Sequence, residues 1–107
     1  MAITESEKAA LQTLRRELSK SYRVKDMRLF GSKARGADTG VSDIDVMIVL
    51  DNLSPQTESK IDDLIFDLNL EYECLISALY FDSAELDSGP LSESPVYKKI
   101  LAEGVKL

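Results

Sequence analysis

The chain has 107 residues, which fits a single domain, 1–107, with a modest core. It contains no histidine, and this excludes a histidine-based catalytic triad, zinc bound by histidine and acid–base catalysis by imidazole. Its net charge of −6 argues against extensive nucleic-acid binding, and its longest apolar run, residues 46–50, is too short to span a membrane.

The charge is unevenly distributed, and the basic first third begins with a predicted helix. Thr4 and Glu7 have the spacing of a capping box and leucines follow at helical intervals, which predicts an amphipathic helix over residues 5–21. Residues 1–35 hold nine Lys/Arg against four Asp/Glu. Most of these cations are expected on the solvated side of the helix, and the alternative is that they face a nucleoside triphosphate or an acidic partner.

A glycine–serine pair follows the first predicted strand. Residues 25–30 are expected to form this strand, and they lead directly into Gly31 and Ser32. Gly31 lets the backbone approach an anion without a Cβ in the way, and Ser32 adds a hydroxyl that can bond a phosphate oxygen. One helical turn is expected from Ser32, followed by a turn-rich connection over residues 36–40.

Two aspartates, Asp43 and Asp45, stand at the start of the second predicted strand, residues 44–50. Successive side chains of a strand alternate between its faces, so both carboxylates point the same way. Neighbouring carboxylates repel each other and lose solvation in an enclosed site, and a divalent cation that also binds phosphate oxygens relieves this repulsion. The alternative is a turn that ends in an acidic strand edge.

The second half of the chain supplies further helices and one more strand. Apolar spacing predicts a helix over residues 57–69, with an acidic outer side, and a strand over residues 74–81. Asp82 or Ser83 is expected to cap a short helical turn, and a last helix is expected over residues 95–103. This order of elements predicts an α/β (α+β) fold, in which helices pack on one small mixed sheet.

Two features of the sequence are typical of a cytoplasmic protein. The first ten residues lack the basic-then-apolar order of a signal peptide. Cys74 is the single cysteine, so no internal disulfide can form, as in proteins of a reducing compartment. We therefore expect a cytoplasmic location and no membrane partner.

Over residues 29–50 the chain resembles the minimal nucleotidyltransferases, the one-domain branch of the superfamily that includes DNA polymerase β. The resemblance is carried by the Gly-Ser pair at 31–32, an Arg-Gly pair at 35–36 and the Asp-Ile-Asp at 43–45 between apolar residues. The closing segment, residues 94–107, also looks like the end of these small proteins. The resemblance implies a nucleotidyltransferase-like fold and two-metal chemistry.

The resemblance assigns the metal ligands first. Asp43 and Asp45 would hold Mg²⁺, with Mn²⁺ as the alternative, and would be catalytic. The family enzymes carry a third carboxylate on the next strand, and it is expected here at the position of Leu75. Glu73 lies two residues earlier and, by strand alternation, would share the face of Leu75. Glu73 is therefore the candidate third carboxylate, and the alternative is a solvated residue at the start of the strand.

The resemblance also assigns the contacts to the nucleotide. Gly31 and Ser32 would bind the β- and γ-phosphates of ATP or another nucleoside triphosphate. Arg35, or else Lys33, would neutralise charge on the transferred phosphoryl group. For both cations the alternative is a loop charge exposed to water. Asp38 has a weaker claim, because a turn residue is the simpler account.

Three functions follow from these assignments. The first is transfer of a nucleoside monophosphate, AMP from ATP, to an acceptor hydroxyl. Small members of the branch resemble the antitoxin of a two-protein module whose partner is a HEPN ribonuclease, which implies a partner tyrosine as acceptor. The second is a protein of the same fold that neutralises such a partner by binding alone, with little or no transfer. The third is an unrelated α/β domain. A homo-oligomer is compatible with all three.

Overall fold

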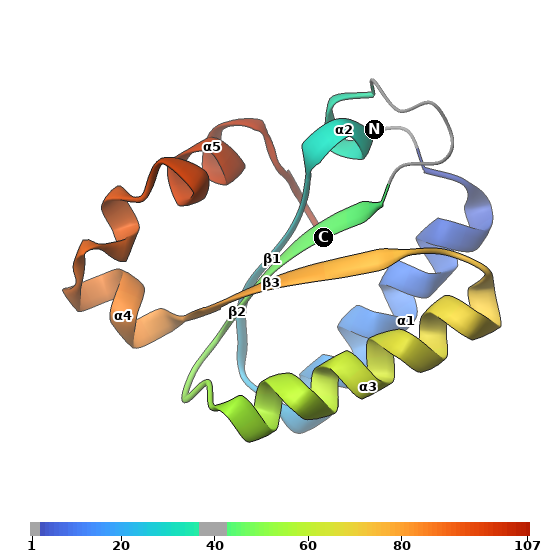
Figure 1. Cartoon of the computed structure of the whole chain (residues 1–107), viewed down its shortest axis with the longest axis horizontal. Helices are drawn as coiled ribbons and strands as arrows, with labels where there is room; N and C mark the ends of the chain where they lie inside the picture. Colours follow the sequence, from blue (N-terminus) through green and yellow to red (C-terminus); the bar gives the residue numbers. More distant parts are fainter. Residues whose placement is uncertain (1–2, 37–42) are drawn as a thin grey trace.

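The computed structural model describes residues 3–36 and 43–107. Within these residues, one four-stranded sheet separates two groups of helices, and Figure 1 shows α1 and α3 on one face with α4 and α5 on the other. The helices are α1 (Glu5–Ser21), α2 (Gly31–Arg35), α3 (Pro55–Tyr72), α4 (Ser83–Ser88) and α5 (Pro95–Glu103), with a 3₁₀ turn, η1 (Pro90–Glu93). The strands are β1 (Val24–Phe30), β2 (Ile44–Leu50), β3 (Ile76–Asp82) and β4 (Val105–Lys106).

The sheet is mixed, and its strands lie in the order β3-β2-β1-β4. Strand β1 runs antiparallel to both β2 and β4, whereas β2 and β3 are parallel and are joined through α3, as a parallel pair requires. In this register Asp45 of β2 lies opposite Phe30 of β1 on one side and beside Ser77 of β3 on the other. The predicted α+β architecture, with helices packed on one small mixed sheet, is confirmed.

Strand β2 is the centre of two hydrophobic clusters, because its side chains alternate between the faces. Ile44, Val46 and Ile48 are fully buried against the long helices α1 and α3. Met47 and Val49 point to the other face and pack with side chains of β3, α4 and α5. By the same alternation, the carboxylate of Asp45 belongs to the face covered by α4 and α5.

The helix and strand boundaries agree with the sequence where the signals are local. Helix α1 begins after the predicted capping box, in which Thr4 and Glu7 each bond the other's backbone N–H. Strand β2 has the predicted ends, and α5 has the predicted range. Among the described residues, no helix has the length and apolar character that crossing a bilayer requires.

Other boundaries differ from the sequence prediction, most clearly those of α3 and β3. Helix α3 is longer at both ends than the predicted 57–69, and β3 begins two residues later than predicted, at Ile76. The cause of the late start is Glu73, which ends α3 in a left-handed conformation with a φ of 51°. Strand β4 is absent from the prediction, since two residues are too few for a periodic signal. The predicted turn at residues 37–40, and with it Asp38, lies outside the described residues.

Candidate functional site

Gly31 and Asp45 lie against each other where β1 passes into α2. Gly31 has a φ of +75°, which favours glycine, and it directly follows Phe30, the residue paired with Asp45. A Cβ atom at Gly31 would collide with Oδ2 of Asp45 and would lie 3.3 Å from its Cγ. The absence of a side chain at Gly31 is therefore what lets the backbone of α2 approach this carboxylate.

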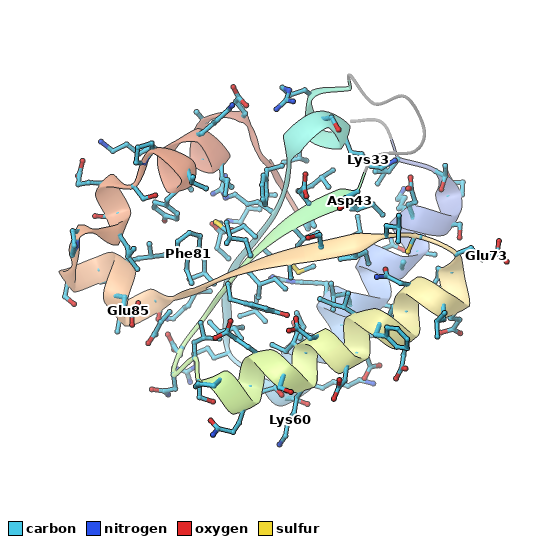
Figure 2. All side chains as sticks on the ribbon, in the orientation of Figure 1. Lys33, Asp43, Lys60, Glu73, Phe81 and Glu85 are labelled. Atoms are coloured by element: carbon cyan, nitrogen blue, oxygen red, sulfur yellow. The ribbon has the colours of Figure 1, made fainter. Side chains whose placement is uncertain are left out.

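Asp43 and Asp45 form an electrostatically unfavourable pair. Asp43 is exposed at the start of β2, where Figure 2 labels it, whereas Asp45 is partly buried. The pKa of Asp45 is raised, first by burial of the carboxyl and second by the negative charge of Asp43. The two side chains offer only oxygen donors, which are the ligands that Mg²⁺ prefers, and a cation there would offset the repulsion that Asp45 experiences.

Replacing Asp45 by asparagine is expected to raise the free energy of unfolding at neutral pH when divalent cations are removed by chelation. Because the pKa of Asp45 is raised in the folded chain, its ionised form opposes folding at pH values above that pKa. The advantage of the variant should shrink as the pH falls through the raised pKa towards the ordinary value of 3.8. Urea unfolding of both proteins at several pH values measures this difference.

Added Mg²⁺ should reverse the order of stability. At about 100 times its Kd, a cation that binds only the folded chain stabilises it by about 2.7 kcal/mol, and Asp45→Asn should lose most of this gain. The matched control is Asp87→Asn, at an exposed aspartate of α4. The control should respond to Mg²⁺ as the wild type does. An equal response of Asp45→Asn and the wild type would show that Asp45 binds no cation.

Strand β3 and the residue that precedes it bring Ser77 and Leu75 next to the aspartates. The N–H of Ile44 donates to the carbonyl oxygen of Leu75 at 2.8 Å, which places Leu75 level with Asp43. The Leu75 side chain is 59% exposed. Ser77 is exposed beside Asp45, and sequence reasoning missed it, because only the parallel register of β2 and β3 reveals this neighbour. The position expected for a third carboxylate therefore carries an apolar side chain.

Glu73 lies apart from the two aspartates. The assumption behind its prediction as third carboxylate, that it shares a strand with Leu75, is wrong. Strand β3 begins only at Ile76, and Glu73 caps the end of α3. Figure 2 shows Glu73 at that end, pointing outward and away from Asp43. Residues 3–36 and 43–107 contain no group of three or more side chains of His, Cys, Asp or Glu that could hold a metal ion.

Lys33 is buried, so the alternative considered for it, a loop charge exposed to water, is wrong. Only 1% of Lys33 is exposed, and its Nζ lies 3.1 Å from Oε2 of Glu7 on α1. Helix α2 is short, and this ion pair ties it to the first turn of α1. A phosphate contact by Lys33 stays a prediction.

Glu7→Gln is expected to lower the free energy of unfolding by roughly 1–3 kcal/mol, because the buried ammonium group of Lys33 loses a charged acceptor. The glutamine oxygen can still accept from the N–H of Thr4, so the cap of α1 is retained. Glu5→Gln, at an exposed position of the same turn, is the control and should change stability by less than about 0.5 kcal/mol. Urea unfolding measures both, and equal effects would contradict a structural role for the ion pair.

A groove of about 220 Å³ separates α2 from α5 beside Gly31. Arg35 and Lys99 contribute positive charge to its lining, and Glu103 contributes a carboxylate. The Nη1 atom of Arg35 lies 3.7 Å from Oε2 of Glu103, and both side chains are nearly half exposed. Sequence reasoning found Arg35 and missed Lys99, because no pattern in the sequence places α5 next to α2. Arg35 and Lys99 therefore line the same groove as Gly31, the residue in contact with Asp45.

Comparison with known proteins adds a family match and a relative. A family model described as a nucleotidyltransferase domain matches residues 11–106. A protein of Methanocaldococcus jannaschii with the name "Putative protein adenylyltransferase" is 44% identical over 41 residues, which make up 38% of this chain and 48% of that protein. The chain therefore spans about half the length of this curated relative.

Proposed function

The chain belongs to the nucleotidyltransferase domain family, and from this membership we propose that it transfers a nucleoside monophosphate from a nucleoside triphosphate to an acceptor hydroxyl. The acceptor oxygen forms a bond to the α-phosphorus, the bond to the β-phosphate oxygen breaks, and pyrophosphate leaves. The name of the relative, a protein adenylyltransferase, supports AMP from ATP as the transferred group and a protein as the acceptor.

The observation that carries the proposal is the close approach of Gly31 to the carboxylate of Asp45. Transfer requires the triphosphate and the acidic residues to meet at one place, and these two residues come from different elements, α2 and β2. Ser32 follows Gly31 in α2 and offers a hydroxyl donor for a phosphate oxygen. Gly31 itself lets a phosphate approach the backbone closely.

Asp43 and Asp45 would hold the divalent cations, Mg²⁺ or Mn²⁺. When bound, such ions lower the pKa of an attacking hydroxyl and neutralise charge on the triphosphate. The ionised carboxylates would contribute the negative charge that retains the cations. A bound cation would lower the raised pKa of Asp45, because its positive charge offsets the repulsion from Asp43. Both roles depend on the two side chains opening to the same side of β2.

Arg35, in the groove between α2 and α5, would bind the triphosphate. Its ion pair with Glu103 is exposed, so the pair contributes only about 0–1 kcal/mol and can be exchanged for a phosphate contact. Lys99 lines the same groove and adds a second positive charge within reach of a bound anion. The two cations together favour a polyanionic ligand over a neutral one.

The apolar side chain of Leu75, at the position expected for a third carboxylate, favours a second function without efficient catalysis. The residue level with Asp43 is apolar, so this position offers no carboxylate to orient or deprotonate the acceptor. The alternative proposal is therefore a catalytically weak antitoxin of the same fold, which neutralises a HEPN ribonuclease by binding it. The two proposals share the fold and differ in whether a covalent product forms.

The deciding experiment is co-expression with the protein encoded by the neighbouring gene, followed by purification, incubation with ATP and Mg²⁺, and intact-mass measurement. A mass gain on the partner equal to one AMP, lost when ATP is omitted, supports transfer. An unmodified partner that stays bound and loses its ribonuclease activity supports the binding role. If the partner is neither modified nor bound, both forms of the proposal fail.

A further inference from the structure

Helix α3 exposes two large apolar side chains on the side turned away from the sheet. Phe66 is 63% exposed and Leu70 is 66% exposed, and they lie one helical turn apart. The buried residues of α3 lie on its opposite side, against β2 and β3. Neither Phe66 nor Leu70 belongs to the hydrophobic clusters, so within the described residues they form an apolar stripe without an intramolecular role.

The apolar stripe has an acidic border. Asp63, Asp67 and Glu71 are exposed on the same part of α3, and residues 61–73 contain no lysine or arginine. We call Phe66, Leu70 and these three acids the acidic stripe. Two such stripes cannot pair with each other without bringing like charges together, which opposes a symmetric dimer through α3. The acidic stripe instead fits an apolar surface bordered by cations.

The same chain carries a surface of that kind beside α1. A groove of about 340 Å³ has an apolar floor and three cations on its border, and none of the described residues that line it is an aspartate or glutamate. We call it the basic groove. Its apolar lining residues are Ile3, Leu11 and Leu107, and its cations are Lys8, Arg15 and Arg16.

Arg15 gives an independent reason to expect an anion in the basic groove. Its Nη1 atom is buried and has no hydrogen-bond partner in the part of the chain that the structure describes. Buried donors without an acceptor are rare in folded proteins, and each is destabilising by about 1–3 kcal/mol. A carboxylate that enters the basic groove offers this guanidinium group an acceptor after a rotation of the Arg15 side chain.

The two surfaces lie on different parts of the fold, so one copy cannot bring them together. Helix α3 packs over β3, at one edge of the sheet, whereas the basic groove lies where α1 meets the residue after β4, at the other edge. The N–H of Leu107 donates to the carbonyl oxygen of Met27, which fixes that side of the groove. Figure 1 shows that α1 and α3, the helices of these two surfaces, lie on the opposite face of the sheet from α4 and α5.

We propose that the acidic stripe of one copy docks into the basic groove of a second copy. Phe66 enters the apolar floor, while Asp63 and Asp67 pair with Lys8, Arg15 and Arg16 of the neighbour. The contact joins two different surfaces, so it generates a closed ring or an open chain of copies. An open chain has a free acidic stripe at one end and a free basic groove at the other. The Gly31–Asp45 contact stays accessible in this assembly.

Sedimentation analysis of the full chain tests the proposal. At about 50 mM salt the average mass should at least double as the protein concentration rises, and at about 0.5 M salt the mass should return to that of a monomer, because salt screens the charge pairs. A stripe variant, Phe66→Ser with Asp67→Lys, and a groove variant, Lys8→Glu with Arg16→Glu, should each be monomeric. An equal mixture of the two should form a discrete dimer, since one intact stripe and one intact groove remain.

Matched controls carry the same chemical changes elsewhere. Leu101→Ser with Asp87→Lys alters an exposed leucine and an exposed aspartate outside both surfaces, and Lys20→Glu with Lys98→Glu reverses two exposed lysines. Both controls should assemble as the wild type does, and circular dichroism should show all variants folded. A wild type that stays monomeric at about 0.5 mM, whether or not another protein binds its stripe, overturns the proposal. A mixture of folded stripe and groove variants that forms no dimer also overturns it.

Discussion

Replacing Asp43 and Asp45 together by asparagine is expected to lower the rate of nucleotide transfer by at least about a thousandfold. Asparagine keeps the size and polarity of each side chain and removes the negative charges that would retain the divalent cations. Loss of several kcal/mol of transition-state stabilisation corresponds to a factor of this size. The fold should persist, because Asp43 is exposed and the raised pKa of Asp45 already shows that its charge does not stabilise the chain.

The measurement is transfer of label from ATP to the co-purified partner, with wild type and variant at equal concentration. Glu85→Gln with Asp87→Asn removes two exposed carboxylates outside the site and the acidic stripe and should leave the rate within a factor of about two, since such surface changes perturb folded proteins little. If the Asp43/Asp45 variant still transfers at the wild-type rate, the carboxylates are not the metal ligands. If it transfers nothing and still neutralises the partner, inhibition by binding alone is the function.

The sequence was most informative where local chemistry decides the structure. The capping box at Thr4 and Glu7 defined the start of α1, and the continuous apolar run after Asp45 defined β2. The glycine–serine pair and the two aspartates led to the family, which the match over residues 11–106 bears out. The glycine and the aspartate that these motifs singled out lie against each other in the structure.

The sequence was least informative where contacts between residues far apart in the chain determine the structure. Burial of Lys33 depends on its meeting Glu7, 26 positions earlier, and no local pattern reports that pair. The alternation argument failed at Glu73, because a single left-handed residue at the end of α3 delays the next strand. Ser77 and Lys99 reach the site only through the strand order and the packing of α5 beside α2. These features follow from the assembled fold.

Gly31→Ala is expected to lower the free energy of unfolding by roughly 2–5 kcal/mol, the sum of strain at a positive φ and of crowding against Asp45. In an Asp45→Ala background the same substitution should be destabilising by only about 1–2 kcal/mol, because the strain remains and the crowding carboxylate is gone. The nearest remaining atom, Cβ of residue 45, lies 3.5 Å from the added methyl group, an ordinary contact.

Urea unfolding of the four proteins in this double-mutant cycle gives the coupling energy between positions 31 and 45, expected at about 1–3 kcal/mol. Gly31→Ala should also lose the stabilisation by Mg²⁺, since a displaced Asp45 carboxylate can no longer share a cation with Asp43. Equal effects of Gly31→Ala in both backgrounds would mean that the two residues are not in contact. The phosphate-binding backbone and the acidic pair would then be separate features, and metal-assisted transfer by this chain would lose its geometric basis.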